Sequence, residues 1–209
     1  MPRDYRDEPD ITIEPVAGLP EALPRGETIL WQGRPRSLAL ARASLNLTWV
    51  AGYFALLGFW RVGSLAADMG WAAALPYAVP FLGLGAAACG LLWLLAWVQA
   101  RNTVYTITTA RVAMRIGAAL TLTLNLPFQR IASADLGASP GGTGTIALTP
   151  VEETRLSYAV LWPHVRPWHV RQPKPALRCI PDPERVAAIL ADAVEARRLT
   201  PHVAVLAAE

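Results

Sequence analysis

Two apolar stretches decide the fold: ASLNLTWVAGYFALLGFW at residues 43–60 and AALPYAVPFLGLGAAACGLLWLLAWV at residues 73–98. Only two of the 58 side chains between residues 43 and 100 are charged, Arg61 and Asp68. A helix needs about 20 mostly apolar residues to cross a bilayer. The sequence therefore predicts a transmembrane helical hairpin, with the polar break Arg61–Met69 in its connecting loop.

The charges that flank the hairpin predict its orientation. Arg36 and Arg42 precede the first apolar stretch, and Arg101 follows the second. Positive charge favours the cytoplasmic side, so we expect both termini in the cytoplasm and a multi-pass protein of the cytoplasmic membrane. The alternative, two buried helices of a large soluble protein, is disfavoured because the rest of this 209-residue chain could not cover so much apolar surface. The net charge of +3 does not indicate a nucleic-acid partner.

Outside the hairpin the apolar pattern has a period of two, which is typical of half-buried antiparallel strands. The strand candidates are residues 27–33, 103–108, 111–116, 119–126, 128–136, 145–149 and 155–162. An amphipathic helix is predicted at residues 183–198, because Val186, Leu190 and Ala193 recur at helical spacing. The first strand precedes the hairpin and the others follow it, so the hairpin is predicted to interrupt one small domain.

The predicted fold class is therefore a membrane-anchored α+β protein, with a two-helix hairpin inserted in a small antiparallel β domain that ends in an amphipathic helix. The chain is predicted to begin with a flexible N-terminal arm (residues 1–26), the first strand with its membrane approach (residues 27–42) and the hairpin (residues 43–100). The main β domain (residues 101–160), a strap rich in Pro, Trp and Arg (residues 161–182) and the C-terminal helix with its tail (residues 183–209) follow.

The sequence contains no pattern that is typical of catalysis or of metal binding. His164 and His169 lack Cys, Asp or Glu neighbours at metal-ligand spacing. The Gly141–Gly144 region is not followed by the Lys and Ser or Thr of a phosphate loop. A histidine can ligate a chlorophyll magnesium, but no histidine lies in the apolar run. We predict a protein that is not an enzyme and has no cofactor; a transient bacteriochlorophyll contact is a minor alternative.

The strap, LWPHVRPWHVRQPKPALRCIPD at residues 161–182, is the best candidate for partner binding. Aromatic residues and arginines dominate the energetics of interfaces, and prolines lower the cost of ordering a segment on binding. The alternative is that the strap only covers the core of its own domain. The candidate partner-binding residues are Trp162, His164, Arg166, Trp168 and Arg171.

Three motifs resemble the bacterial pleckstrin-homology-like membrane proteins. They are YTITTARVAMRIG (residues 105–117), LPFQRIASADL (residues 126–136) and GTGTIAL (residues 142–148). The resemblance covers about residues 27–160 and implies a pleckstrin-homology-like (PH-like) β domain.

Together with the rest of the chain, the strap resembles the photosynthetic complex assembly proteins of purple phototrophic bacteria. That resemblance implies a non-catalytic factor for assembly of the photosynthetic reaction centre and core light-harvesting antenna. The implied partners are reaction-centre subunits, the core antenna and membrane lipids. The resemblance is also compatible with a homodimer. The alternative functions are a membrane-anchored PH-like scaffold that senses lipid or the cell envelope, and a pigment-binding protein.

Overall fold

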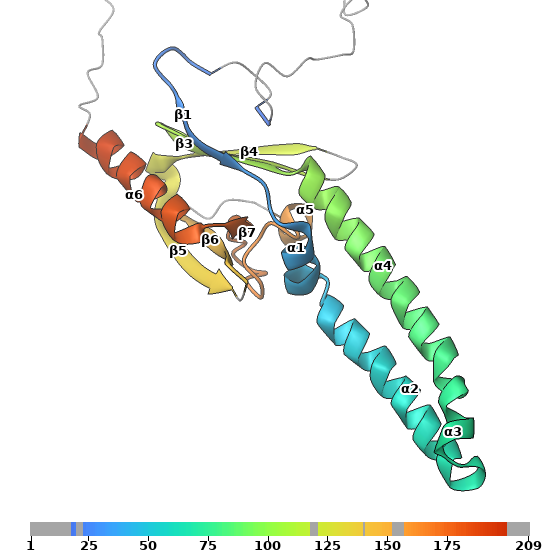
Figure 1. Cartoon of the computed structure of the whole chain (residues 1–209). Coiled ribbons are helices and arrows are strands. Elements are labelled where there is room, and N and C mark those ends of the chain that lie inside the picture. The colour runs from blue at the N-terminus through green and yellow to red at the C-terminus, as the bar shows by residue number, and fades with distance from the viewer. Residues whose placement is uncertain (1–17, 20–22, 118–120, 140, 152–156, 200–209) are drawn as a thin grey trace, which may run out of the picture.

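The computed structural model describes residues 18–19, 23–117, 121–139, 141–151 and 157–199. The predicted flexible arm at residues 1–26 lies mostly outside this range, as does the tail after Leu199. The described chain forms a β domain from which a long helical hairpin projects (Figure 1).

The β domain consists of two antiparallel sheets and a C-terminal helix, an architecture that agrees with the PH-like fold. The four-stranded sheet has the order β1 (Ile29–Gly33), β2 (Val104–Thr108), β3 (Arg111–Ile116), β4 (Leu122–Pro127). The three-stranded sheet has the order β5 (Ile131–Ser139), β6 (Thr143–Pro150), β7 (Ala176–Pro181). A short 3-10 helix, η2 (Phe128–Arg130), links the two sheets.

The core lies between the sheets and beneath helix α6 (Pro183–Leu199). Val186, Leu190 and Ala193 are the buried stripe of α6, as their spacing predicts. The same core cluster contains apolar side chains from both sheets, among them Ile107, Val112, Met114, Ile146, Leu148, Leu177 and Ile180. Burial of each large aliphatic side chain contributes about 1.5–3 kcal/mol, so this cluster is the main source of the domain's stability.

A paired carboxylate fixes the approach to β1. Glu27 accepts hydrogen bonds from Arg111 Nε (2.9 Å) and Nη2 (3.2 Å), and from the Thr108 hydroxyl (2.7 Å). Thr108 also accepts hydrogen bonds from the backbone N–H groups of Ala110 and Arg111, which closes the β2–β3 turn. The segment before the hairpin is thereby attached to the first turn after it.

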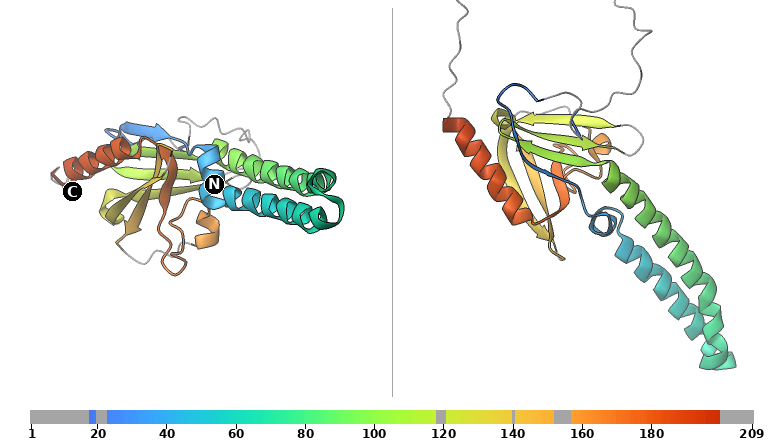
Figure 2. Two further views of the ribbon diagram at one scale, coloured as in Figure 1. Left: turned by 60° about the horizontal axis from the view of Figure 1, so that its bottom comes forward. Right: turned by 45° about the horizontal axis from the view of Figure 1, so that its top comes forward.

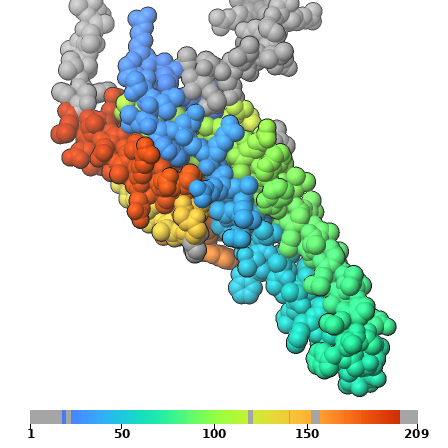
Figure 3. Space-filling view, viewed as in Figure 1, coloured from blue at the N-terminus to red at the C-terminus, as the bar shows by residue number. Residues whose placement is uncertain are grey.

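The hairpin lies between β1 and β2 in the chain, as predicted, and consists of five helical segments. They are α1 (Ser37–Ser44), α2 (Leu47–Met69), α3 (Trp71–Ala74), the 3-10 helix η1 (Leu75–Ala78) and α4 (Val79–Asn102). Within the described residues, α2 and the run from Trp71 to Asn102 are long and apolar enough to cross a membrane. Figure 3 shows that most of the hairpin extends beyond the domain.

Two predicted elements differ from the structure, and two elements of the structure were not predicted. The connecting loop predicted from Arg61 onward is helical, because residues 61–69 contain no proline and α2 ends only at Gly70, whose φ of 83° makes the reversal. The sequence analysis missed α1, which Asn46 (φ 52°) separates from α2.

The prediction of a strand at residues 155–162 is wrong. Its described part contains helix α5 (Tyr158–Leu161), which turns Tyr158 and Leu161 toward the core. A short apolar run cannot distinguish the two states by periodicity alone. The strand that was missed, β7, lies inside the predicted strap, where Pro175 before it and Pro181 as its last residue concealed it.

Candidate functional site

The strap folds as a loop on two paired arms. The backbone N–H of Ala176 donates to the His164 carbonyl (2.9 Å), and that of Arg166 donates to the Lys174 carbonyl (2.9 Å). We call residues 164–176 the strap loop; residues 167–173 form its tip. Because the arms hold each other, the tip has a defined position before any partner binds.

A buried polar cluster joins the strap loop to the base of the hairpin. We call this cluster the junction. Its members are Thr103 at the end of α4, Tyr105 on β2, His164 in the strap loop, and Arg178 on β7. His164 Nε2 lies 3.1 Å from Thr103 Oγ1, and His164 Nδ1 lies 2.6 Å from the Tyr105 hydroxyl oxygen. The two contacts connect elements about 60 positions apart in sequence.

The hydrogen bonds of the junction select one histidine tautomer. Thr103 donates its hydroxyl hydrogen to the Gln99 carbonyl (2.8 Å), so it can only accept from His164 Nε2–H. Nδ1 is then the acceptor for the Tyr105 hydroxyl, whose oxygen accepts the Arg178 backbone N–H (3.3 Å). Every ring nitrogen of His164 is therefore satisfied in the neutral form.

Burial keeps the junction uncharged at the histidine and the tyrosine. Desolvation, with a smaller contribution from the positive Arg178, lowers the pKa of His164 to about 3. Desolvation also raises the pKa of Tyr105 far above its ordinary value. Both groups therefore stay neutral across the physiological range, and their hydrogen bonds connect the strap loop to the end of α4.

Arg178 connects the junction to the first helix of the hairpin. Its guanidinium donates to the Pro163 carbonyl (3.2 Å) and to the Ala43 carbonyl in the last turn of α1 (3.2 Å). A cation is favourable at a helix C-terminus, where carbonyls lack intrahelical partners. The backbone N–H of Arg36 also donates to the Cys179 carbonyl (2.9 Å), so β7 holds both ends of α1.

The predicted partner-binding residues divide into a buried one and four that reach the surface. His164 is only 1% exposed, so it cannot contact a partner, and we correct its role to that of a junction residue. Trp168 is 93% exposed at the loop tip and Trp162 is 39% exposed. Arg171 is exposed, while Arg166 is half-buried and donates to Asp135 on β5 (2.7 Å).

The predicted membrane-flanking arginines lie around the base of the hairpin. Arg36 is exposed just before α1, and Arg42 is exposed in the last turn of α1. Arg101 is exposed in the last turn of α4, with its guanidinium 5.3 Å from the centre of the Trp97 ring. An arginine beside an indole at a helix end is typical of the boundary between hydrocarbon and headgroups.

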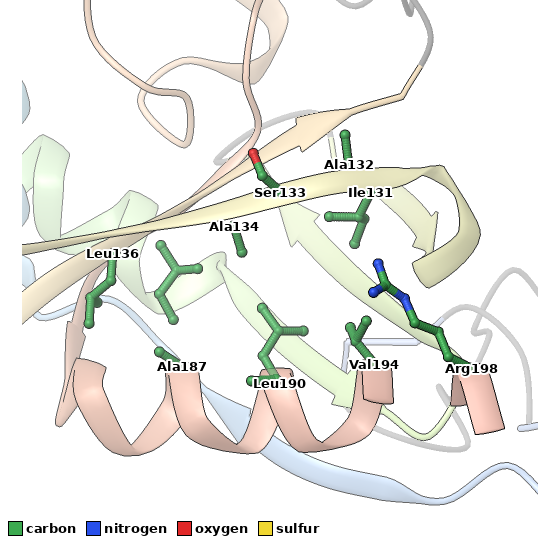
Figure 4. Close-up of a pocket in the computed structure, with 11 residues that line it drawn as sticks. Ile131, Ala132, Ser133, Ala134, Leu136, Ala187, Leu190, Val194 and Arg198 are labelled. Atoms are coloured by element: carbon green, nitrogen blue, oxygen red, sulfur yellow. The ribbon is translucent and has the colours of Figure 1, made fainter. Parts of the chain in front are cut away.

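An apolar groove of about 380 Å³ lies between β5 and α6 (Figure 4). Ile131, Leu136, Leu190 and Val194 line it, and the Arg198 side chain lies at one end. Nothing in its lining provides a nucleophile–base pair. Among the described residues no three His, Cys, Asp or Glu side chains are grouped to hold a metal ion.

Sequence reasoning missed Thr103, Tyr105 and Arg178. Thr103 and Tyr105 look like ordinary strand residues, and their partners are remote in sequence. The one usable signal is Arg178, a charged residue between the apolar neighbours Leu177 and Cys179. Such a position predicts a buried, hydrogen-bonded guanidinium, because charged side chains are seldom buried without partners.

Comparison with known proteins gives two matches. Residues 47–194 match the bacterial PH domain family. The chain is 47% identical over 196 residues to a Rhodobacter capsulatus protein described as an uncharacterized 23.7 kDa protein in the puhA 5′ region; the alignment covers 93% of this chain and 92% of that relative. No solved structure matches the chain.

Proposed function

This chain belongs to the bacterial PH domain family, and from that premise we propose that it is a membrane-anchored, non-catalytic assembly factor for the photosynthetic reaction centre and the core light-harvesting complex. The observation that carries the proposal is the relative from the puhA region, which is alike over almost the whole length of both chains. That gene region suggests a photosynthetic context. The proposal includes membership among the PuhB photosynthetic complex assembly proteins.

The proposed anchor is the hairpin, which crosses the cytoplasmic membrane twice with both termini in the cytoplasm. Its support is the apolar length of α2 and α4 and the exposed Arg36, Arg42 and Arg101 at one end. Large apolar side chains such as Trp49, Phe59 and Leu84 are exposed along it. Water disfavours such a surface, whereas lipid or a neighbouring membrane protein can cover it.

The proposed mechanism is temporary cover of newly inserted subunits. The side of the hairpin contacts their transmembrane helices until the proper neighbours arrive, and the strap contacts their cytoplasmic parts. The proposed strap contacts are Trp162, Arg166, Trp168 and Arg171. A homodimer is compatible with this arrangement, and no step of it requires a catalytic residue or a cofactor.

A deletion strain tests the assembly role. We expect less mature reaction centre, measured by its absorbance in membranes, with pigment synthesis unchanged. The gene supplied on a plasmid restores the wild-type level. An unaltered amount of reaction centre in the deletion strain would refute the role, and a parallel loss of free pigment would indicate a function in pigment synthesis instead.

Membrane anchoring is tested separately by fractionation. The full chain is expected in the membrane fraction after washes with carbonate and high salt, and in the soluble fraction only after detergent. Release by the carbonate wash would contradict two membrane-spanning helices.

The second candidate is a lipid- or envelope-sensing scaffold, which the arginines at the base of the hairpin favour. The full chain would be reconstituted in nanodiscs with and without anionic lipid, and amide exchange of residues 36–44 compared. Protection that depends on anionic lipid supports sensing, and protection that is equal in both lipids argues against it.

A further inference from the structure

We infer that the tip of the strap loop, residues 167–173, docks an acidic segment of a membrane protein that lies beside the hairpin, and that the junction sets the position of this docking surface. The inference rests on the proposed function and deepens it, because it names the chemistry and the place of the partner segment.

The tip is an ordered surface in the free protein. Two backbone hydrogen bonds, Ala176 to His164 and Arg166 to Lys174, pair its arms, and Val165 bridges to Pro175. Within the tip the His169 ring nitrogen Nδ1 lies 2.9 Å from the Pro167 carbonyl and can donate to it. A segment ordered in advance loses less conformational entropy when it binds.

Trp168 is the strongest sign that the tip binds a partner. Its side chain is 93% exposed, and Val170 beside it is 63% exposed. Its φ of 66° lies in the left-handed region, which costs a residue with a Cβ roughly 1–2 kcal/mol. Neither feature helps the domain to fold. A large aromatic side chain held outward on a strained backbone is suited to fill a pocket on another molecule.

The charge around Trp168 is positive. Arg166 is neutralised by Asp135 through a 2.7 Å ion pair. Among the described residues, no carboxylate lies within ion-pair distance of Arg171 or Lys174. Arg171 and Lys174 follow the exposed Trp168 by three and six residues in the chain. Two such cations and an indole fit an acidic segment that also offers an apolar side chain, since complementary charge gives specificity and fast association.

The place of the loop favours a neighbouring protein over the lipid surface. In the left view of Figure 2 the hairpin extends to the right. The orange-brown segment that contains the strap loop leaves the domain in a different direction. The strap loop therefore does not run along the hairpin, and its exposed tip can reach a protein that stands next to the hairpin. The junction fixes this geometry, because His164 contacts the end of α4 and Arg178 links the Pro163 carbonyl to the end of α1.

Binding to purified reaction centre–core antenna complex tests the inference. The full chain in detergent micelles carries a label, and its Kd for the complex is measured at two salt concentrations. We expect Trp168→Ala and Arg171→Glu each to raise Kd at least tenfold. The matched controls, Leu199→Ala and Arg198→Glu on α6, are expected to change Kd less than twofold. Higher salt is expected to weaken the wild type more than Arg171→Glu.

The outcomes separate this inference from the proposed function. If the wild type does not bind the complex, the proposed function fails and the inference with it. If the wild type binds and both tip variants bind equally well, the inference is overturned while the assembly role stands. Loss of binding in Trp168→Ala without any effect of Arg171→Glu or salt overturns the acidic partner. Trp168-dependent binding to vesicles containing anionic lipid, with none to the complex, overturns the protein partner in favour of headgroups.

Discussion

Buried His164 makes the stability of the domain depend on pH, and replacing it by glutamine is expected to remove most of that dependence. The pKa of His164 is about 3 in the folded chain and 6.5 in an unperturbed chain. Between these values the unfolded state binds a proton that the folded state does not. The contribution to stability is therefore complete above pH 6.5 and is lost as pH falls toward 3.

The two pKa values give the size of the effect. From pH 7 to pH 5 the free energy of unfolding is expected to fall by about 2 kcal/mol through this one group. For a chain of this size that corresponds to a decrease in Tm of roughly 4–8 °C. Thermal unfolding of the detergent-solubilised full chain at both pH values, followed by intrinsic fluorescence, measures the decrease.

His164→Gln keeps a polar side chain in the junction but cannot titrate, so it is expected to lose much less stability between pH 7 and pH 5 than the wild type. His169→Gln is the matched control, because His169 lies at the loop tip outside the junction. It should retain the wild-type pH dependence. Equal decreases in Tm for the wild type and His164→Gln would refute the reasoning and place the pH dependence in other groups.

Three further changes test other contacts. Arg178→Met leaves the Pro163 and Ala43 carbonyls without their donor and is expected to cost about 1–3 kcal/mol, with faster amide exchange in both the strap loop and α1. Glu27→Gln weakens the paired contact with Arg111 and is expected to speed exchange in β1 while α6 is unchanged. Gly85→Ala places a Cβ 2.6 Å from the Phe54 Cβ and is expected to lower the protease resistance of the hairpin, whereas Gly83→Ala, which meets nothing within 4 Å, is the neutral control.

The large elements could be predicted from the sequence because each is encoded locally. The hairpin follows from an uninterrupted apolar composition, and α6 follows from a 3.6-residue period that packing on the sheets preserves. The paired strands β2 to β4 were predicted from an apolar period of two, although β2 is buried along its whole length and β4 begins at Leu122, three residues after the predicted start. These signals depend on near neighbours in the chain, where composition and spacing carry the information.

The junction could not be predicted because the contacts that join its members are remote in sequence. Tyr105 and His164 are 59 positions apart, and Arg178 and Ala43 are 135 positions apart. The same absence of local information explains why His164 looked like a surface residue in a polar, proline-rich strap. Its burial depends on α4 and β7 coming together, which is a property of the completed fold.

The insertion of the hairpin in the β1–β2 connection has a mechanical consequence for the proposed assembly role. A domain appended to a membrane anchor is joined by one linker and can rotate. Here two covalent connections enter the domain, and the junction adds hydrogen bonds from α1 and α4 to β7 and the strap loop. In the proposed role, the loop and the hairpin would therefore contact a neighbouring subunit together.

When the loop and the hairpin keep a fixed relative position, binding by one raises the effective concentration of the other. Neither contact then has to be strong alone. Two weak contacts that act jointly can hold an incomplete subunit, and can still be displaced one at a time when the final partner covers either surface. A rigid junction thus suits a protein that binds its partners temporarily.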